Sequence, residues 1–376
     1  MGKFAELVPE RVRALAAYVP GKPIQQAEAE SGLKMIKLGS NENPFGPSPL
    51  AIRAMEAASK SLHLYPDNDM VLLRERLAAH HGISPNQLIV TAGSTNLLDI
   101  LARTLLSPGL NAVTSERSFI VYPIVTRSAG AELRHVPTRN DGFDLDAISD
   151  AIDSDTRLVF IANPNNPTGT MIPAREMDRF LDRLPENVIV ALDEAYFEYA
   201  DWLARARNLD YSHAIDYVRH ERSVVVLRTF SKAYGLAAAR VGYGMGPAEL
   251  ISYLVRLKTA FIVNGVGEAG ALAALDDREH YEKSMCNNAA QLTVLTRQLR
   301  ELGYEPVESW ANFLYIETGE DASVLGRRLQ MNGIIVRPLT GSWGARTAIR
   351  VTVGSPEENQ KFIEALKHVT RGAHTR

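Results

Sequence analysis

The residues best suited to chemistry follow a strongly β-prone run at residues 223–227. Lys232 lies just beyond this run, preceded by the hydroxyl groups of Thr229 and Ser231 and followed by the guanidinium group of Arg240. A lysine amine attacks carbonyl carbons and, when its pKa is lowered, also acts as a general base. The two hydroxyl groups and the arginine could hold a phosphate dianion. A solvated loop lysine is the ordinary alternative, so the other strand ends must decide between the two interpretations.

A carboxylate occupies the end of another predicted strand. Asp193 follows the apolar run at residues 188–192 and is followed by Glu194, Ala195 and Tyr196. Burying an aspartate costs free energy unless the carboxylate meets a cation or strong hydrogen-bond donors. Asp193 is therefore either a helix cap or the permanent partner of a buried cationic ring nitrogen.

Two further strand-end loops could orient a ligand. Residues 163–169 combine two prolines, three asparagines and a glycine, which makes a rigid turn that can hold an asparagine amide at a fixed angle. Residues 91–95 form a small-residue turn before an apolar helix, where free backbone N–H groups suit a phosphate. An N-cap is the simpler interpretation of Ser94 and Thr95.

Helices and apolar strands alternate along most of the chain. Helices are predicted at residues 70–80, 97–106, 122–129, 144–151 and 173–184, each followed by a short apolar strand. Continuous apolar strands separated by amphipathic helices indicate a mostly parallel sheet with helices on both faces, hence an α/β fold. Such sheets bind ligands at the carboxyl ends of their strands. The lysine, the aspartate and the two turns all stand at such ends.

Three regions are predicted along the chain. Residues 1–40 form an N-terminal arm, residues 41–262 a large domain, and residues 263–376 a smaller α+β domain. The small domain is expected to hold a long helical region at 267–302, broken near 276–277, and strands at 313–316, 334–336 and 348–353.

Composition narrows the class of protein. The chain has 376 residues, 45% of them hydrophobic, which is enough for a sizeable core. Its net charge is −3, with acids and bases mixed, so the sequence gives no sign of the clustered basic face that binds nucleic acid. The single cysteine, Cys286, excludes a disulfide scaffold and a thiolate zinc site and fits a reducing compartment. Charges within residues 1–20 argue against a signal peptide or membrane span. We expect a cytoplasmic enzyme without a metal site.

Together the motifs resemble the fold-type-I pyridoxal-phosphate (PLP) aminotransferases, and among these most closely the histidinol-phosphate aminotransferases. The resemblance extends from about residue 18 to residue 353. It rests on residues 18–23, 40–47, 65–67, 163–169, 193–196, 229–235 and 350–354. It implies a PLP-binding large domain and a functional homodimer. The glycine-rich run at 242–246 lacks the spacing of a dinucleotide fingerprint and is predicted to be a strand and turn.

The resemblance assigns roles around the cofactor ring. Lys232 would form the Schiff base and then move the proton between Cα and C4′, while Asp193 would keep the ring nitrogen protonated so that the ring acts as an electron sink. Asn166 and Tyr196 would hydrogen-bond the ring O3′, and Tyr122 would stack on the ring. The resemblance places the cofactor phosphate on Gly93, Ser94, Ser231 and Arg240, with Thr229 as a weaker candidate and Tyr65 reaching in from the second subunit.

The substrate end implied by the resemblance contains two arginines. Arg350 would bind the carboxylate or phosphate arm of the amino donor, and Arg337 would add the second positive charge that a phosphate favours. Tyr18 and Asn43 would complete the site. The arginine fork binds either anion bidentately, so it does not name the substrate, and both arginines could instead be surface residues beside the acids at 317–321.

The reaction expected from the resemblance converts histidinol phosphate and 2-oxoglutarate to imidazole acetol phosphate and glutamate, a step of histidine biosynthesis. The alternatives are a broad aromatic amino-acid aminotransferase, an amino-acid phosphate decarboxylase on the same scaffold, and a binding module that has lost the chemistry. The joint presence of Lys232, Asp193, Asn166, Tyr196 and Arg240 argues against the last. The chain departs from the family pattern at residues 94–96, which lack the usual acidic residue, and at residues 115–119, which lack the usual proline-led run.

Overall fold

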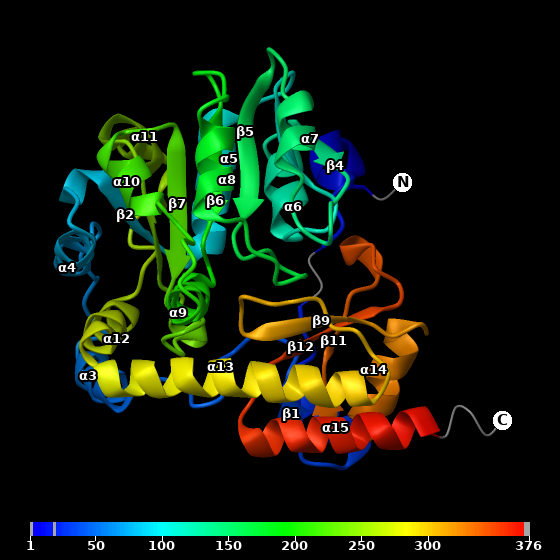
Figure 1. Cartoon of the computed structure of the whole chain (residues 1–376). Coiled ribbons are helices and arrows are strands. Elements are labelled where there is room, and N and C mark those ends of the chain that lie inside the picture. The colour runs from blue at the N-terminus through cyan, green and yellow to red at the C-terminus, as the bar shows by residue number, and fades with distance from the viewer. Residues whose placement is uncertain (1–2, 18–19, 372–376) are drawn as a thin grey trace.

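A seven-stranded sheet forms the centre of the larger part of the molecule (Figure 1). The computed structural model describes residues 3–17 and 20–371, so the predicted substrate contact Tyr18 lies outside the described residues. The strands run in the order β2-β8-β7-β6-β5-β3-β4, and only β8 is antiparallel to its neighbours. Their bounds are β2 (Leu88–Thr91), β3 (Asn111–Ser115), β4 (Glu132–Val136), β5 (Thr156–Ala162), β6 (Ile189–Asp193), β7 (Val224–Thr229) and β8 (Gly242–Met245). The predicted α/β fold with a mostly parallel sheet is confirmed.

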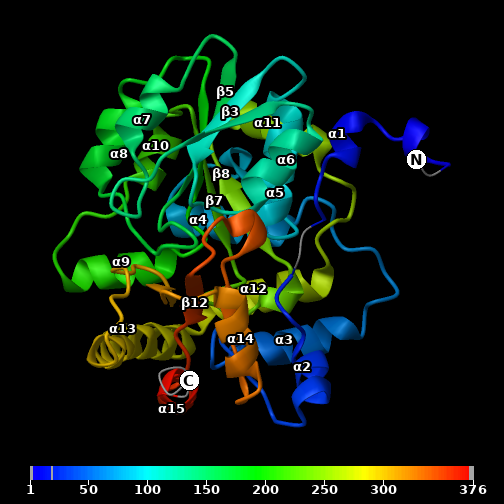
Figure 2. The same cartoon turned by 90° about the vertical axis from the view of Figure 1, so that its right-hand side faces the viewer.

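Helices cover both faces of this sheet, with α5, α6 and α11 on one side and α7, α8 and α10 on the other (Figure 2). The helices associated with the sheet are α4 (Val71–His81), α5 (Ser94–Leu105), α6 (Val121–Ser128), α7 (Leu145–Asp150), α8 (Ala174–Leu181), α10 (Ala214–Arg219) and α11 (Ala248–Leu257). The helix α9 (Phe197–Ala206) follows β6 and packs into the core of the smaller part. Because both faces are covered, the central strands have no solvent-facing side, and their sequences are therefore continuous apolar runs.

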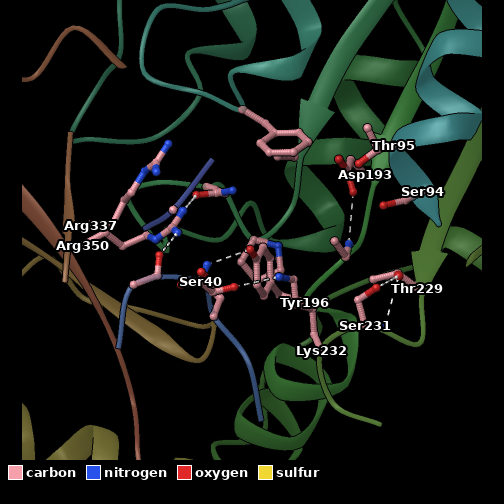
Figure 3. Close-up of a pocket in the computed structure, with 18 of the residues that line it drawn as sticks. Ser40, Ser94, Thr95, Asp193, Tyr196, Thr229, Ser231, Lys232, Arg337 and Arg350 are labelled. Atoms are coloured by element: carbon pink, nitrogen blue, oxygen red, sulfur yellow. Dashed lines mark hydrogen bonds between the residues drawn. The ribbon is translucent and has the colours of Figure 1, made fainter. Parts of the chain in front are cut away.

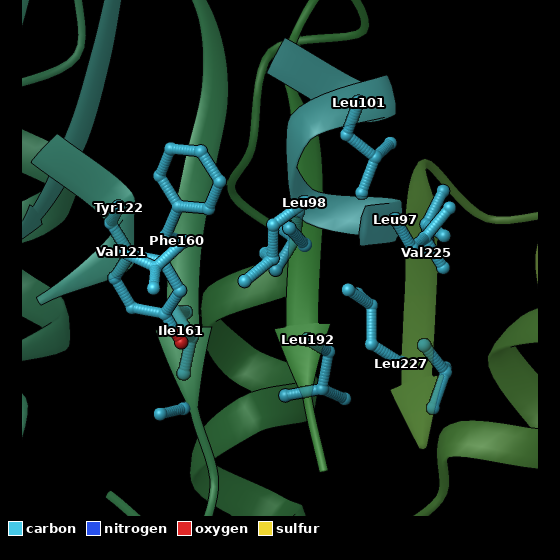
Figure 4. Packing of buried hydrophobic residues seen from close by; sticks show 14 of the residues in the cluster. Leu97, Leu98, Leu101, Val121, Tyr122, Phe160, Ile161, Leu192, Val225 and Leu227 are labelled. Carbon is cyan, nitrogen blue, oxygen red and sulfur yellow. The ribbon is translucent and has the colours of Figure 1, made fainter. Parts of the chain in front are cut away.

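The core between α5 and the sheet fixes the carboxyl edge of the strands. Leu97, Leu98 and Leu101 of α5 pack against side chains of β5, β6 and β7, and all of them are buried (Figure 4). Burial of a leucine contributes about 1.5–3 kcal/mol relative to exposure. The same packing presses the N-terminus of α5 onto β8, where a Cβ at Gly242 would lie only 2.5 Å from the backbone N of Ser94. Glycine at position 242 thus permits the approach that brings Ser94 to the strand ends.

The smaller part of the molecule packs beneath the sheet and contains its own three-stranded antiparallel sheet, in the order β11-β12-β9 (Figure 1). The predicted break in the long helical region is confirmed, because Asp277 separates two helices and its side chain accepts a hydrogen bond from the His280 backbone N. The elements are α12 (Gly265–Asp276), α13 (Arg278–Glu301), β9 (Phe313–Glu317), α14 (Ala322–Gln330), β10 (Ile334–Ile335), β11 (Arg337–Pro338), β12 (Ala348–Thr352) and α15 (Pro356–Arg371).

The strand predicted at residues 334–336 is confirmed as β10, and a second short strand that was not predicted, β11, follows it in another sheet. β10 pairs in parallel with β1 (Ile36–Lys37), and β11 pairs antiparallel with β12. Pro338 has no N–H group to donate, so β11 cannot extend far as a ladder. The change of sheet places Arg337 directly opposite Arg350 in the β11–β12 register.

The N-terminal segments run alongside both parts. The remaining elements are η1 (Ala5–Leu7), α1 (Glu10–Arg13), α2 (Ile24–Ser31), α3 (Pro49–Ser59), η2 (Pro85–Gln87), η3 (Ala237–Ala239) and η4 (Gly341–Trp343). Leu38 belongs to the core of the smaller part, and α3 packs on α12. The division of the chain at residues 40 and 262 remains a prediction.

Candidate active site

A cavity of about 180 Å³ opens at the carboxyl ends of β5, β6 and β7 and faces the smaller sheet. Lys232 and Tyr196 lie in its middle (Figure 3). Ser94, Thr95, Asp193, Thr229 and Ser231 line one side, and Arg337 and Arg350 line the other (Figure 3). Of the predicted site residues, the structure brings together in this cavity Ser94, Asn166, Asp193, Tyr196, Ser231, Lys232, Arg240, Arg337 and Arg350, with Thr229.

Lys232 enters the cavity from a tightly packed turn after β7. Its Nζ donates a hydrogen bond to the Ser40 carbonyl over 3.2 Å. The turn requires glycine at position 235, where φ is +69° and a Cβ would lie 2.1 Å from the Gly46 carbonyl oxygen. Burial, reinforced by the Arg350 guanidinium, lowers the pKa of Lys232 to about 8. A larger share of the amine is therefore neutral near physiological pH than for an ordinary lysine.

Asp193 ends β6 with its carboxylate buried, at 4% exposure. Oδ2 accepts a hydrogen bond from the Tyr122 hydroxyl over 3.1 Å, and Oδ1 accepts one from the Ala195 backbone N over 3.2 Å. Burial raises the pKa of Asp193 to about 6 despite these two donors. Both donors are neutral groups, so a cation placed in the cavity would gain strongly from this carboxylate.

A cradle of groups suited to a phosphate lies on the Asp193 side of the cavity, at the N-terminus of α5 (Figure 3). Gly93 has φ +81°, and a Cβ there would meet Arg240 Nη2 at 2.5 Å, so only glycine lets the arginine close over the turn. Arg240 Nη1 donates to Ser231 Oγ over 3.2 Å, and Thr229 Oγ1 donates to Ser231 Oγ over 3.0 Å. The helix N-terminus, the hydroxyl groups and the guanidinium together form a binding site for an anion.

The opposite side of the cavity is also cationic. Arg350 is buried, at 6% exposure; Nη1 donates to Asn166 Oδ1 over 2.6 Å and Nη2 to the Gly39 carbonyl over 3.0 Å. Arg337 is more exposed and stands directly across the β11–β12 ladder. Like charges directly opposite on neighbouring strands are destabilising. The pair is therefore better explained by an anionic ligand than by stability.

The predicted stacking role of Tyr122 needs correction. Its side chain is fully buried and stacks on Phe160, with ring centroids 4.7 Å apart, so it presents no face to the cavity. Phe119, one helical turn earlier, lines the cavity instead. The sequence at 119–122 contains two aromatic residues, but it does not show which of their rings faces the cavity. Tyr122 contacts Asp193 from behind.

The predicted substrate contact of Asn43 also needs correction. Its Nδ2 donates to the Ala233 carbonyl and to Ser284 Oγ, each over 2.9 Å, and Asn43 is not among the residues that line the cavity. It fixes the lysine turn from behind. Asn41 takes the position at the cavity, with φ +56° and Nδ2 donating to the Tyr196 hydroxyl over 2.8 Å.

Tyr65 does not approach the cavity of its own chain. Its side chain is 83% exposed, and its ring lies against Phe261 with centroids 4.8 Å apart. Ser40, Phe119 and Trp343, which were not predicted as site residues, also line the cavity, as does Thr95 of the predicted phosphate turn. Ser40 lay within a recognised motif, whereas Trp343 carried no signal in the sequence.

Within residues 3–17 and 20–371, no group of three or more His, Cys, Asp or Glu side chains is gathered as a metal ion would need. None of the described helices is both long enough and apolar enough to cross a membrane.

Comparison with known proteins agrees with this site. Residues 34–366 match the family model for aminotransferase class I and II. The chain belongs to the aminotransferase class I and II family, and it is an aminotransferase, as the motifs predicted.

Individual relatives narrow the comparison. The chain is 42% identical over 371 residues to histidinol-phosphate aminotransferase 2 of Pseudomonas fluorescens, covering 98% of both chains. It is 42% identical over 372 residues to the protein of the same name from Pseudomonas aeruginosa, covering 98% of this chain and 99% of the other. A crystal structure of histidinol-phosphate aminotransferase from Sinorhizobium meliloti in complex with pyridoxal-5'-phosphate superposes with a TM-score of 0.87 at 29% identity, covering 97% of this chain and 98% of that one.

Proposed function

We propose that this chain is a PLP-dependent transaminase that converts histidinol phosphate and 2-oxoglutarate to imidazole acetol phosphate and glutamate, a step of histidine biosynthesis. The observation that carries the proposal is the pair Arg337 and Arg350, set directly opposite each other across the cavity from Lys232 and Asp193. The relatives described above are named histidinol-phosphate aminotransferase, which supports the proposal.

The residues present fit PLP. A buried aspartate with a raised pKa suits a cationic ring nitrogen, and the glycine turn at Gly93 with Arg240 closing over it suits a phosphate. The depressed pKa of Lys232 suits an amine that must attack an aldehyde. When bound, PLP supplies an electron sink that stabilises negative charge at the substrate Cα.

The chain's own residues would supply the remaining steps. Lys232 Nζ would take the proton from the substrate Cα and return it on the neighbouring carbon, as a general base and then a general acid. Asp193 would hold the ring nitrogen protonated. Phe119, rather than Tyr122, would cover one face of the ring. Tyr196, held by Asn41, and Asn166, held by Arg350, would orient the ring oxygen.

The arginine pair supports a doubly charged substrate arm. One carboxylate is satisfied by a single arginine fork, whereas a phosphate monoester carries nearly two charges and three acceptor oxygens. Arg350 is the anchored member and Arg337 the more exposed one. Because a transaminase binds donor and acceptor in turn, the same two arginines can also receive the carboxylates of 2-oxoglutarate.

A homodimer is part of the proposal. Tyr65 is exposed and does not line its own cavity, and the surface around it also carries exposed apolar side chains. The neighbouring exposed residues are Leu62, Leu64, Leu72, Phe261 and Ile262. We propose that a second copy covers this surface and that, as the sequence resemblance implies, its Tyr65 contributes to the phosphate cradle. A cytoplasmic location is likewise proposed, on the single cysteine of the chain.

The experiment is a parallel assay of the purified PLP-loaded protein with histidinol phosphate, phenylalanine and phosphothreonine as substrates. The proposal expects the highest kcat/KM with histidinol phosphate and formation of glutamate from 2-oxoglutarate. Preferential turnover of phenylalanine would support a broad aromatic aminotransferase, and release of carbon dioxide from phosphothreonine would support the decarboxylase. Negligible turnover of histidinol phosphate would refute the proposal.

A further inference from the structure

The ring of Trp343 lies close to the guanidinium groups of both arginines. This tryptophan ends the short helix η4, is 7% exposed, and lines the cavity together with Arg337 and Arg350. The Arg337 guanidinium carbon lies 5.9 Å from the centre of the indole ring, and that of Arg350 lies 5.7 Å from it. Both distances fall within the range of cation–π attraction.

The loop that carries Trp343 is built to hold the ring in this place. Gly341 and Gly344, both with positive φ, bracket the tryptophan. Ala345 N donates to the Leu339 carbonyl over 2.9 Å, and Leu339 N donates to the Ala348 carbonyl over 2.9 Å, which ties the loop to β12. These hydrogen bonds fix the backbone around Trp343, and burial in the apolar core holds the ring itself.

The indole contributes its face rather than its N–H group. Nε1 is buried and has no hydrogen-bond partner among the described residues. Buried tryptophans usually find an acceptor for this group. The contacts that account for the side chain are thus apolar packing against residues such as Leu339 and Ala348 and the two guanidinium groups.

We propose that Trp343 is a positioning residue that sets specificity, because it holds Arg337 and Arg350 together as a clamp for a phosphate monoester dianion. The inference rests on the proposed function for the identity of the donor. The two guanidinium groups repel each other, and an aromatic face that attracts both offsets part of that repulsion. Arg350 is fixed independently by Asn166 and Gly39, so a carboxylate can be bound without Trp343. A dianion needs both arginines in place.

The test measures anion affinity separately from turnover. Dissociation constants of methyl phosphate and of acetate are determined by calorimetry on the PLP-loaded protein for the wild type, W343L and W343F. W343L keeps apolar bulk and loses the aromatic face; we expect methyl phosphate to bind about tenfold more weakly, which is about 1.4 kcal/mol, and acetate to change less than twofold. W343F restores a face, and methyl phosphate should bind within about threefold of wild type.

The matched control is Trp310, which is also 7% exposed and carries the Arg207 guanidinium 4.6 Å from its ring, away from the cavity. W310L should leave both dissociation constants unchanged. Equal losses for the two anions in W343L, no loss, or the same loss in W310L would overturn the proposal. If W343L does not fold, W343F decides, because it should show up to about threefold weaker methyl phosphate with acetate unaltered, and equal change for both anions would count against the clamp.

A double variant separates the clamp from general packing. In the R337Q background, the further change W343L should alter methyl phosphate affinity less than twofold, because the arginine that it positions is already absent. A full tenfold loss in that background would show that Trp343 acts otherwise. Failure of the wild type to turn over histidinol phosphate would refute the proposed function alone, since these affinities use no substrate.

Discussion

The two ends of the cavity are built in different ways. The end that would hold the cofactor takes its residues from loops that directly follow β2, β6 and β7, so each functional side chain stands next to the strand that positions it. The end with the arginines belongs to β11 and β12 of the smaller sheet, and its other contacts come from Ser40, Asn166 and Trp343.

This difference has a physical consequence. A strand-end residue is fixed once the sheet forms, because the register and the buried core leave the loop little freedom. The arginines depend on the meeting of the two parts and on the pairing of Arg350 with Asn166 and Gly39. Substitutions at the first end should therefore reduce activity with every substrate. Substitutions at the second end can change which anion is bound.

Replacing Lys232 tests the first end most severely. The variant K232A removes the amine that we propose to attack the cofactor aldehyde and to move the proton, so kcat should fall by about 10⁴-fold or more. Borohydride treatment should no longer attach the cofactor to the protein, which mass spectrometry would detect. The exposed Lys367→Ala is the control and should behave as wild type. Borohydride labelling that persists in K232A would assign the chemistry to another lysine.

Replacing Asp193 separates chemistry from binding at the same end. Opposite charges about 3 Å apart at an effective dielectric of about 20 interact by roughly 5 kcal/mol before desolvation. D193N keeps the shape and loses this charge, so kcat should fall by about 10³-fold, with a smaller loss of PLP affinity. Both are measured by turnover and by fluorescence titration of PLP. A variant with kcat within tenfold of wild type would remove the aspartate from the mechanism.

Substitutions at the second end should divide by substrate. R350Q removes the anchored arginine, and kcat/KM should fall about 10- to 100-fold for both histidinol phosphate and phenylalanine, as expected for loss of charge-assisted hydrogen bonds. R337Q should cost a similar factor with histidinol phosphate and less than about threefold with phenylalanine. Steady-state kinetics with the two donors measures this. Equal losses in R337Q would mean that the two ends do not differ as argued.

The difference between the two ends also explains which parts of the site could be predicted from the sequence. The residues that follow strands were placed together correctly, because apolar runs mark the strands and ligands gather at their carboxyl ends. Lys232, Asp193, Asn166, Ser94 and Arg240 all meet in the cavity. The roles given to them remain proposals.

The contacts that failed depend on orientation or on long-range packing. Phe119 lies just before α6 and Tyr122 lies in its first turn. The sequence does not say which of the two rings faces the cavity. Asn43 lies near Asn41, but its amide is already used by Ala233 and Ser284. Trp343 lies in the connection between β11 and β12, so its contact with the arginines depends on the pairing of these two strands, and β11 was not predicted.

Removing the hydroxyl of Tyr122 should have the smallest effect of these changes, and it tests how Asp193 is held at the first end. Burial holds the pKa of this hydroxyl far above its usual value, so it stays protonated and donates to Asp193. Y122F keeps the ring on Phe160 and loses this hydrogen bond, so the pKa of Asp193 should rise further and kcat should fall about fivefold, as a net loss of about 1 kcal/mol implies. Stopped-flow turnover and thermal unfolding are measured together.

Tyr217→Phe is the matched control for Y122F, because the Tyr217 hydroxyl donates to the Asp178 carboxylate over 2.6 Å outside the cavity. Both variants lose a hydroxyl–carboxylate hydrogen bond and should lose similar stability. Only Y122F should lower kcat, since only Asp193, the carboxylate that Tyr122 contacts, lines the cavity proposed to hold the cofactor ring. A matching drop in Y217F would mean that general stability, rather than the placement of Asp193, governs the rate. An unchanged kcat in both would mean that Ala195 N alone holds Asp193 well enough for the reaction.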